Sequence, residues 1–134
     1  MRSIGFIAGF LTPPSMLALP ALAAIRAVPV LVGKVAGLDA CATLGEVSGL
    51  DPQGYGFLAV RTGPGSAHAL VDKLSEERRV FVCDERGAWT GIVYSNDPGD
   101  IDCGVGSPLE APEPYAGACR SGWVNPGWIK AVGG

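Results

Sequence analysis

The sequence predicts a small all-β barrel, and three observations support this fold class. Short apolar runs with strand character alternate with Gly- and Pro-containing turns, most clearly between Phe57 and Tyr94. The 20 Gly and 11 Pro residues suit a turn-rich β fold better than a helical one. The length of 134 residues and the four cysteines fit one small exported domain with a targeting segment and two disulfide bonds.

The first 23 residues have the features of a secretory signal peptide. Arg2 supplies a positive start, an apolar run extends from Ile4 to Leu19, and small residues occupy Ala21-Leu22-Ala23. We expect cleavage after Ala23, which places the protein in the periplasm or outside the cell and leaves no membrane span. A lipoprotein is the alternative, because Leu38-Asp39-Ala40-Cys41 resembles a lipid-attachment box, although Asp39 fits that box poorly.

Residues 24–50 are expected to form an extended lead-in to the barrel. Pro29 excludes a central strand there, and an N-terminal edge strand is the alternative. Residues 41–53 read as a loop, because Gly45, Gly49 and Pro52 are turn formers.

The barrel itself is expected over residues 51–134. Each predicted strand combines β-branched or aromatic residues with a bounding turn, and the set is Tyr55–Thr62, Val71–Leu74, Arg79–Cys83, Trp89–Tyr94 and Gly122–Ile129, the last with a one-turn 3₁₀ element. Residues 95–120 are rich in Pro and Gly and form an insertion before the last strand.

The cysteines indicate two disulfide bonds rather than a zinc site. No two of them lie within four residues of each other, whereas zinc ligands usually come in close pairs. Cys103 and Cys119 both lie in the insertion and are expected to close it on itself. Because antiparallel strands place Cys83 at the opposite end of the barrel from the insertion, Cys83 is left to pair with Cys41.

Three motifs resemble the bacterial SH3-type (SH3b) domain. They are Leu58-Ala59-Val60-Arg61-Thr62-Gly63-Pro64-Gly65, Gly87-Ala88-Trp89, and Gly122-Trp123-Val124 followed by Trp128. The resemblance covers residues 51–131 and implies a small SH3-like barrel. The disulfide-closed insertion at 95–120 is a departure, since the family usually has a short turn there.

The resemblance also implies a non-catalytic binding module outside the cytoplasm. Trp89 and Trp128 match positions that form a peptide groove in eukaryotic relatives. Tyr115 in the insertion is a further candidate contact, while the groove's usual first-strand tyrosines are missing from Leu58–Arg61. The implied ligand is a peptide or a cell-envelope component such as peptidoglycan. The alternatives are a periplasmic protein-interaction subunit and a hydrolase inhibitor that acts through residues 95–120.

Other functional classes find little support in the sequence. His68 is the only histidine, and Ser66 lies too close along the chain to form a catalytic set with it. The net charge of −3 gives no electrostatic footprint for nucleic acid. The acidic turn at residues 97–102 lacks the ligand spacing of a calcium loop. We therefore expect no enzyme activity, metal or cofactor.

The signal-peptide interpretation predicts a mature chain that begins at Ala24 and is recovered from the cell-envelope fraction. N-terminal sequencing of protein isolated from that fraction measures this directly. An intact Met1 on such material would contradict the prediction, and lipid on Cys41 would favour the lipoprotein alternative.

Overall fold

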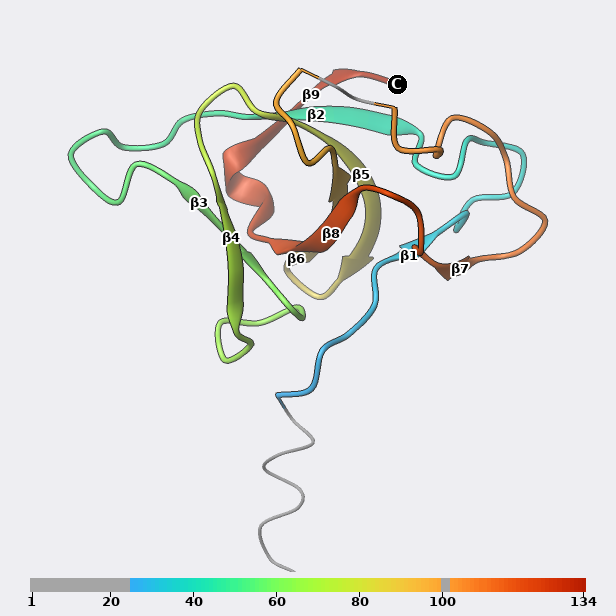
Figure 1. Cartoon of the computed structure of the whole chain (residues 1–134), viewed down its shortest axis with the longest axis horizontal. Coiled ribbons are helices and arrows are strands. Elements are labelled where there is room, and N and C mark those ends of the chain that lie inside the picture. The colour runs from blue at the N-terminus through green and yellow to red at the C-terminus, as the bar shows by residue number, and fades with distance from the viewer. Residues whose placement is uncertain (1–24, 100–101) are drawn as a thin grey trace, which may run out of the picture.

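The computed structural model describes residues 25–99 and 102–134, and these residues form an all-β structure, as predicted (Figure 1). The expected signal peptide and its cleavage site lie outside the described residues. The elements in chain order are β1 (Leu31–Val32), β2 (Thr43–Val47), β3 (Leu58–Arg61), β4 (Leu70–Leu74), β5 (Arg79–Arg86), β6 (Trp89–Tyr94), β7 (Glu113–Pro114), β8 (Arg120–Val124), the 3₁₀ turn η2 (Pro126–Trp128) and β9 (Ile129–Gly133).

Seven of these strands form one antiparallel sheet in the order β4-β3-β8-β6-β5-β2-β9, and β1 pairs separately with β7. β4 and β9 are the sheet's two edges. Hydrogen bonding therefore does not close the sheet into a barrel. The strands nevertheless curl around one interior, because apolar side chains from six of them pack into a single cluster: Val47, Leu58, Val60, Leu74, Val80, Ile92, Tyr94 and Val124.

A second apolar cluster lies on the other face of β5 and β6. The segment that contains β1 and the 95–120 insertion covers this face, as the right-hand side of Figure 1 shows. Val93 at its centre is fully buried, and Val32 and Val105 pack against it from the two covering segments. The insertion is therefore a packed part of the domain, held by its own apolar residues as well as by its disulfide bond.

The structure has both predicted disulfide bonds, Cys41–Cys83 and Cys103–Cys119. The reason given for the pairing is wrong, however. Cys83 does not lie at the opposite end of the sheet from the insertion, because Cys83, Cys103 and Cys119 all belong to the second cluster. The insertion folds back across the outer face of β5 and brings its own bridge next to Cys41–Cys83.

The loop predicted at residues 41–53 contains a strand that sequence reasoning missed. β2 lies between β5 and β9 in the main sheet, so residues 24–50 are more than a lead-in. Gly45 explains why the strand was missed, because glycine is typical of turns, and it also allows β9 to pack closely against β2. A Cβ at Gly45 would lie only 2.7 Å from Cγ2 of Ile129, so glycine permits the close approach of β9.

The predicted last strand, Gly122–Ile129, is two strands joined by η2. β8 ends at Val124, and Pro126 starts the 3₁₀ turn, whose first residue tolerates a missing N–H. β9 then leaves at Ile129 to pair with β2 on the far side of the sheet. The chain thus contributes its last two strands to opposite regions of the same sheet.

Asp84 fixes the N-terminal segment to β5. Its side chain is fully buried and accepts hydrogen bonds from the Leu31 backbone N–H at 3.0 Å and from Lys34 Nζ at 2.6 Å. Gly91 on the paired strand makes room for it, since a Cβ at Gly91 would lie 2.9 Å from the Asp84 Cβ and 3.0 Å from Val30. A buried carboxylate is stable here because a cation and a backbone donor satisfy it.

Replacing this carboxylate should therefore destabilise the fold. We expect Asp84→Ala to lower the free energy of unfolding by about 2 kcal/mol, because the Leu31 N–H and Lys34 lose their buried partner. Glu85→Ala is the matched control, since Glu85 is the exposed neighbour on the same strand. Urea denaturation measures both, and equal stabilities of the two variants would contradict the anchoring role.

Candidate ligand-binding groove

A groove of about 430 Å³ lies beside the start of β3. Its size is in the usual range for small-ligand sites. The lining combines aromatic and aliphatic side chains with a few polar groups, and the full set is Tyr55, Phe57, Leu58, Ala59, Arg61, Ser66, Leu70, Trp89, Asn125 and Trp128.

Trp128 is presented to the groove by η2. The Asn125 side chain caps this turn by accepting a hydrogen bond from the Gly127 N–H at 2.9 Å. The carbonyl of Trp128 accepts from the Ser48 N–H at 2.9 Å, which ties the turn to the end of β2. With its backbone held in this way, Trp128 keeps 40% of its surface exposed and is not a core residue.

Trp89 reaches the same groove from a different element. It is the first residue of β6 and pairs with Arg86 across the turn at Gly87. Gly87 has φ +59°, a left-handed conformation that favours glycine in a tight hairpin. Trp89 is half-buried. The structure thus brings Trp89 and Trp128, both singled out from the sequence, to one groove.

Two further groove aromatics were missed by sequence reasoning. Tyr55 and Phe57 come from the loop before β3, and their ring centroids lie 5.6 Å apart. Lys73 Nζ lies 4.8 Å from the Phe57 ring centroid, within cation–π range. The aromatic residues were expected within Leu58–Arg61, whereas Tyr55-Gly56-Phe57 directly precedes that strand. That short aromatic run was the available signal.

Tyr115, the third predicted ligand residue, does not line this groove. It is half-buried in the second cluster, where its hydroxyl donates to the Cys103 carbonyl at 2.9 Å and accepts from the Cys119 N–H at 3.1 Å. Its neighbours Glu113 and Pro114 are exposed, but the Tyr115 ring turns inward. Tyr115 therefore links the two cysteines of the insertion.

The loop of residues 62–69 brings Ser66 to the groove, and internal contacts hold this loop in place. Arg61 Nη1 donates to the His68 carbonyl at 2.9 Å, and the Thr62 N–H donates to the Ala69 carbonyl at 2.9 Å. The His68 ring packs against Gly63, where a Cβ would overlap it. The His68 side chain therefore helps to hold the loop in shape.

No protein-family model, no curated protein and no solved structure matches the chain at a significant level. The resemblance to SH3b domains therefore remains a sequence-based prediction. Within residues 25–99 and 102–134, no helix has the length and apolar character needed to cross a bilayer. The same part of the chain has no group of three or more His, Cys, Asp or Glu residues positioned to bind a metal ion.

The exposures of Trp128 and Trp123 predict losses of stability of different size when each is replaced by alanine. Trp128→Ala should cost no more than about 1 kcal/mol, as for a surface substitution. Trp123→Ala is the matched comparison and should cost about 3 to 5 kcal/mol, because Trp123 is fully buried. Thermal or urea unfolding distinguishes the two variants. A loss at Trp128 as large as that at Trp123 would make Trp128 a core residue and contradict its assignment to the groove.

Proposed function

We propose that the protein is an exported, non-catalytic binding module with an SH3-type fold, and that its aromatic groove takes a peptide or a peptide-bearing cell-envelope component such as peptidoglycan. The observation that carries the proposal is the gathering of four aromatic side chains around one groove. Tyr55 and Phe57 come from the loop before β3, Trp89 from β6 and Trp128 from η2.

The exposure of these aromatics supports a binding role. Tyr55 is 89% exposed and Trp128 is 40% exposed. Aromatic side chains supply a large contact area for few rotatable bonds, and they are enriched where a partner covers them. Exposed aromatic surface contributes little to the stability of the fold, so its concentration in one groove favours a role in ligand recognition.

The polar groups of the groove favour a ligand with peptide-like hydrogen-bonding groups. Arg61, Ser66 and Asn125 line the groove between the aromatic side chains. An apolar surface with a few placed donors and acceptors is typical of sites that orient a ligand by hydrogen bonds. A peptide presents both apolar side chains and backbone amides to such a surface.

The rival proposal, inhibition of a hydrolase through residues 95–120, has less support. The aromatic residue of the described insertion, Tyr115, turns into the domain and bonds to Cys103 and Cys119. Val105 and Leu109 of the insertion also belong to the second cluster, on the outer face of β5 and β6. These contacts favour a covering role for the insertion.

Binding to purified peptidoglycan tests the proposed function. We expect the full-length mature protein to co-sediment with the sacculi, and Trp128→Ala to bind at least about 30-fold more weakly, the loss typical of an interface hot spot. Tyr55→Ala should weaken binding in the same direction. Val35→Ala is the control, because Val35 is 57% exposed but does not line the groove.

Two results would contradict the proposal. If the wild-type protein does not co-sediment, peptidoglycan is not the ligand. If it does co-sediment but Trp128→Ala and Tyr55→Ala bind as the wild type does, the aromatic groove is not the binding site.

A further inference from the structure

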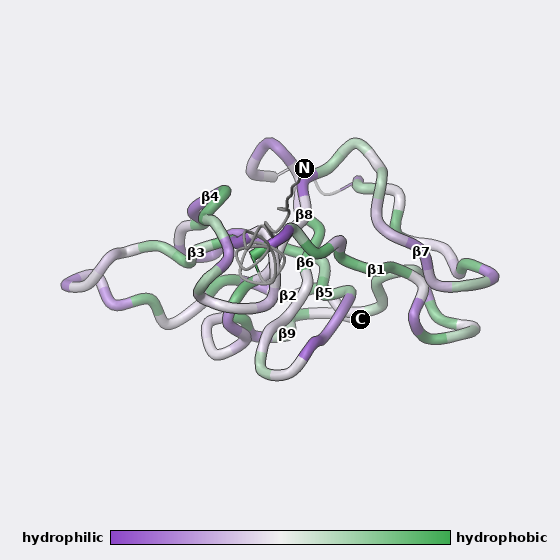
Figure 2. The backbone as a smooth tube through the Cα atoms, turned by 90° about the horizontal axis from the view of Figure 1, so that it is seen from below, coloured by the Kyte–Doolittle hydropathy of each residue, from purple (hydrophilic) through white to green (hydrophobic). Residues whose placement is uncertain are grey.

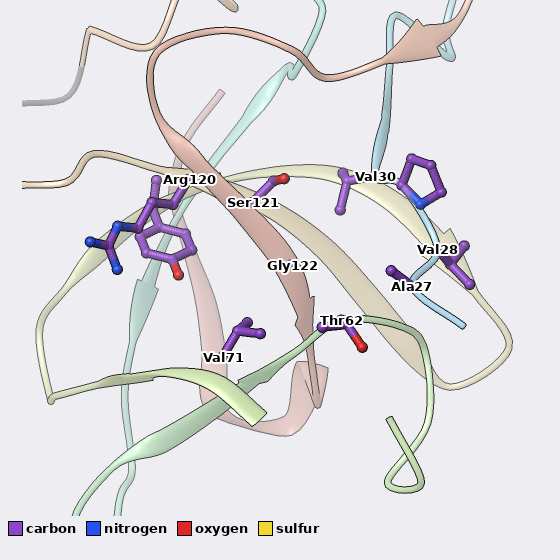
Figure 3. Close-up of a pocket in the computed structure, with 10 residues that line it drawn as sticks. Ala27, Val28, Val30, Thr62, Val71, Arg120, Ser121 and Gly122 are labelled. Carbon is purple, nitrogen blue, oxygen red and sulfur yellow. The ribbon is translucent and has the colours of Figure 1, made fainter. Parts of the chain in front are cut away.

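A second cleft opens where β3 and β8 separate (Figure 3). Among the described residues these two strands pair at one position, Arg61 with Trp123. The N-terminal half of β8, Arg120 to Gly122, still pairs with β6 on its other side. On the side toward β3, residues 120–122 have no strand partner, although they lie in the middle of the sheet.

The direction of the backbone groups along this edge follows from the pairing. Thr62 directs its N–H toward β4, where it donates to the Ala69 carbonyl. The Thr62 N–H is therefore not bonded to β8, which leaves Arg61 and Trp123 as the hydrogen-bonded pair of these two strands, so Trp123 directs its N–H and C=O toward β3. Ser121 lies two residues before Trp123 and therefore points its N–H and C=O to the same side. Both groups face the cleft, which is an edge that an extended peptide can join.

The walls of the cleft are mostly apolar. The N-terminal segment contributes Val28, Pro29 and Val30, and Val71 of β4 lies opposite them, as Figure 3 shows. The volume of about 470 Å³ is enough for a few residues of peptide. This wall is fixed in place, because the Val28 N–H donates to the Thr62 carbonyl at 2.8 Å and the Val28 carbonyl accepts from the Trp123 indole at 2.8 Å.

A guanidinium group lies at one end of the cleft. Arg120 and Tyr94 line it, and both bond to the same Asp72 oxygen, Arg120 Nη1 at 3.4 Å and the Tyr94 hydroxyl at 2.9 Å. Burial, reinforced by Asp72, raises the pKa of Tyr94 well above its usual value, so its hydroxyl stays protonated. The guanidinium of Arg78 lies 5.5 Å from the Tyr94 ring centroid.

Arg120 is the cation that lines the cleft, in a protein whose net charge is −3. A guanidinium with unused N–H groups attracts a ligand carboxylate by charge-assisted hydrogen bonds. Arg120 is more than half exposed, and its recorded bonds to Asp72 and Asn96 use Nη1 and Nε. Its guanidinium has further N–H groups to donate.

We propose that this cleft is a second binding site, separate from the aromatic groove, for an extended apolar peptide that ends in a free carboxylate. The peptide backbone pairs with Ser121 as an added strand. Its aliphatic side chains pack between the 28–30 wall and Val71. Its terminal carboxylate lies against Arg120, at the charged end of the cleft.

The test uses the mature protein and a pair of synthetic peptides, acetyl-Ala-Val-Val-Val with a free carboxylate and the same peptide with a terminal amide. Calorimetric or NMR titration should show binding of the free acid and about tenfold weaker binding of the amide, the loss expected for a hydrogen bond to a charged group. Equal affinities of the two peptides, or no binding of the free acid, would overturn the proposal. This test needs no variant of the protein.

Variants then locate the peptide in the cleft. Arg120→Gln should weaken binding of the free acid by about tenfold and abolish the preference for it over the amide. Ser121→Pro removes the backbone N–H that faces the cleft, while Ser121→Ala keeps it, so only the proline variant should lose binding. Equal binding by the two Ser121 variants would overturn strand addition.

A groove variant separates this site from the proposed function. Trp128→Ala should bind the free acid as the wild type does, because Trp128 does not line the cleft. A loss of binding in Trp128→Ala would place the peptide in the aromatic groove and overturn the second site. Failure of the protein to bind peptidoglycan, by contrast, would leave the result of the peptide titration intact.

Discussion

The buried carboxylate of Asp84 is the interaction on which the N-terminal part of the structure depends. It binds the backbone of Leu31 and the ammonium group of Lys34, and Cys83 beside it forms the bridge to Cys41. Two adjacent residues of β5 thus attach the N-terminal segment by charge and by covalent bond. The segment then acts as a platform. β7 of the insertion pairs with β1, and the Tyr115 N–H donates to the carbonyl of Val30.

The aromatic groove is separated in space from the features that attach the N-terminal segment and the insertion. The four cysteines pack in the second cluster together with Val32 of β1. In Figure 1, β1 and β7 lie at one end of the molecule and the loop before β3 lies at the other. Figure 2 gives a second view of this separation, with apolar residues running through the central strands and β1. The aromatic side chains of the groove come from β6, η2 and the loop before β3, and none of them belongs to the second cluster. Because these side chains are not needed to pack the insertion against the sheet, their surfaces can remain exposed.

Local signals were sufficient for several elements, whereas the disulfide pairing was predicted correctly from a wrong placement of Cys83. Trp89–Tyr94 was predicted with the observed bounds, because its β-branched and aromatic residues lie between clear turn formers. β2 was missed because Gly45 reads as a turn former until the distant Ile129 is placed beside it. The inward turn of Tyr115 and the contribution of Tyr55 to the groove depend in the same way on tertiary contacts. Such contacts join residues far apart in the chain, and no local pattern records them.

The central claim is that the aromatic groove, and not the core, meets the ligand. The three tryptophans give three indole N–H signals in a ¹H–¹⁵N spectrum, and the buried Trp123 serves as an internal control for Trp89 and Trp128. Titration with soluble peptidoglycan fragments should shift the Trp89 and Trp128 signals and leave the Trp123 signal in place. Shifts confined to Trp123, or no shift in any of the three, would contradict the account.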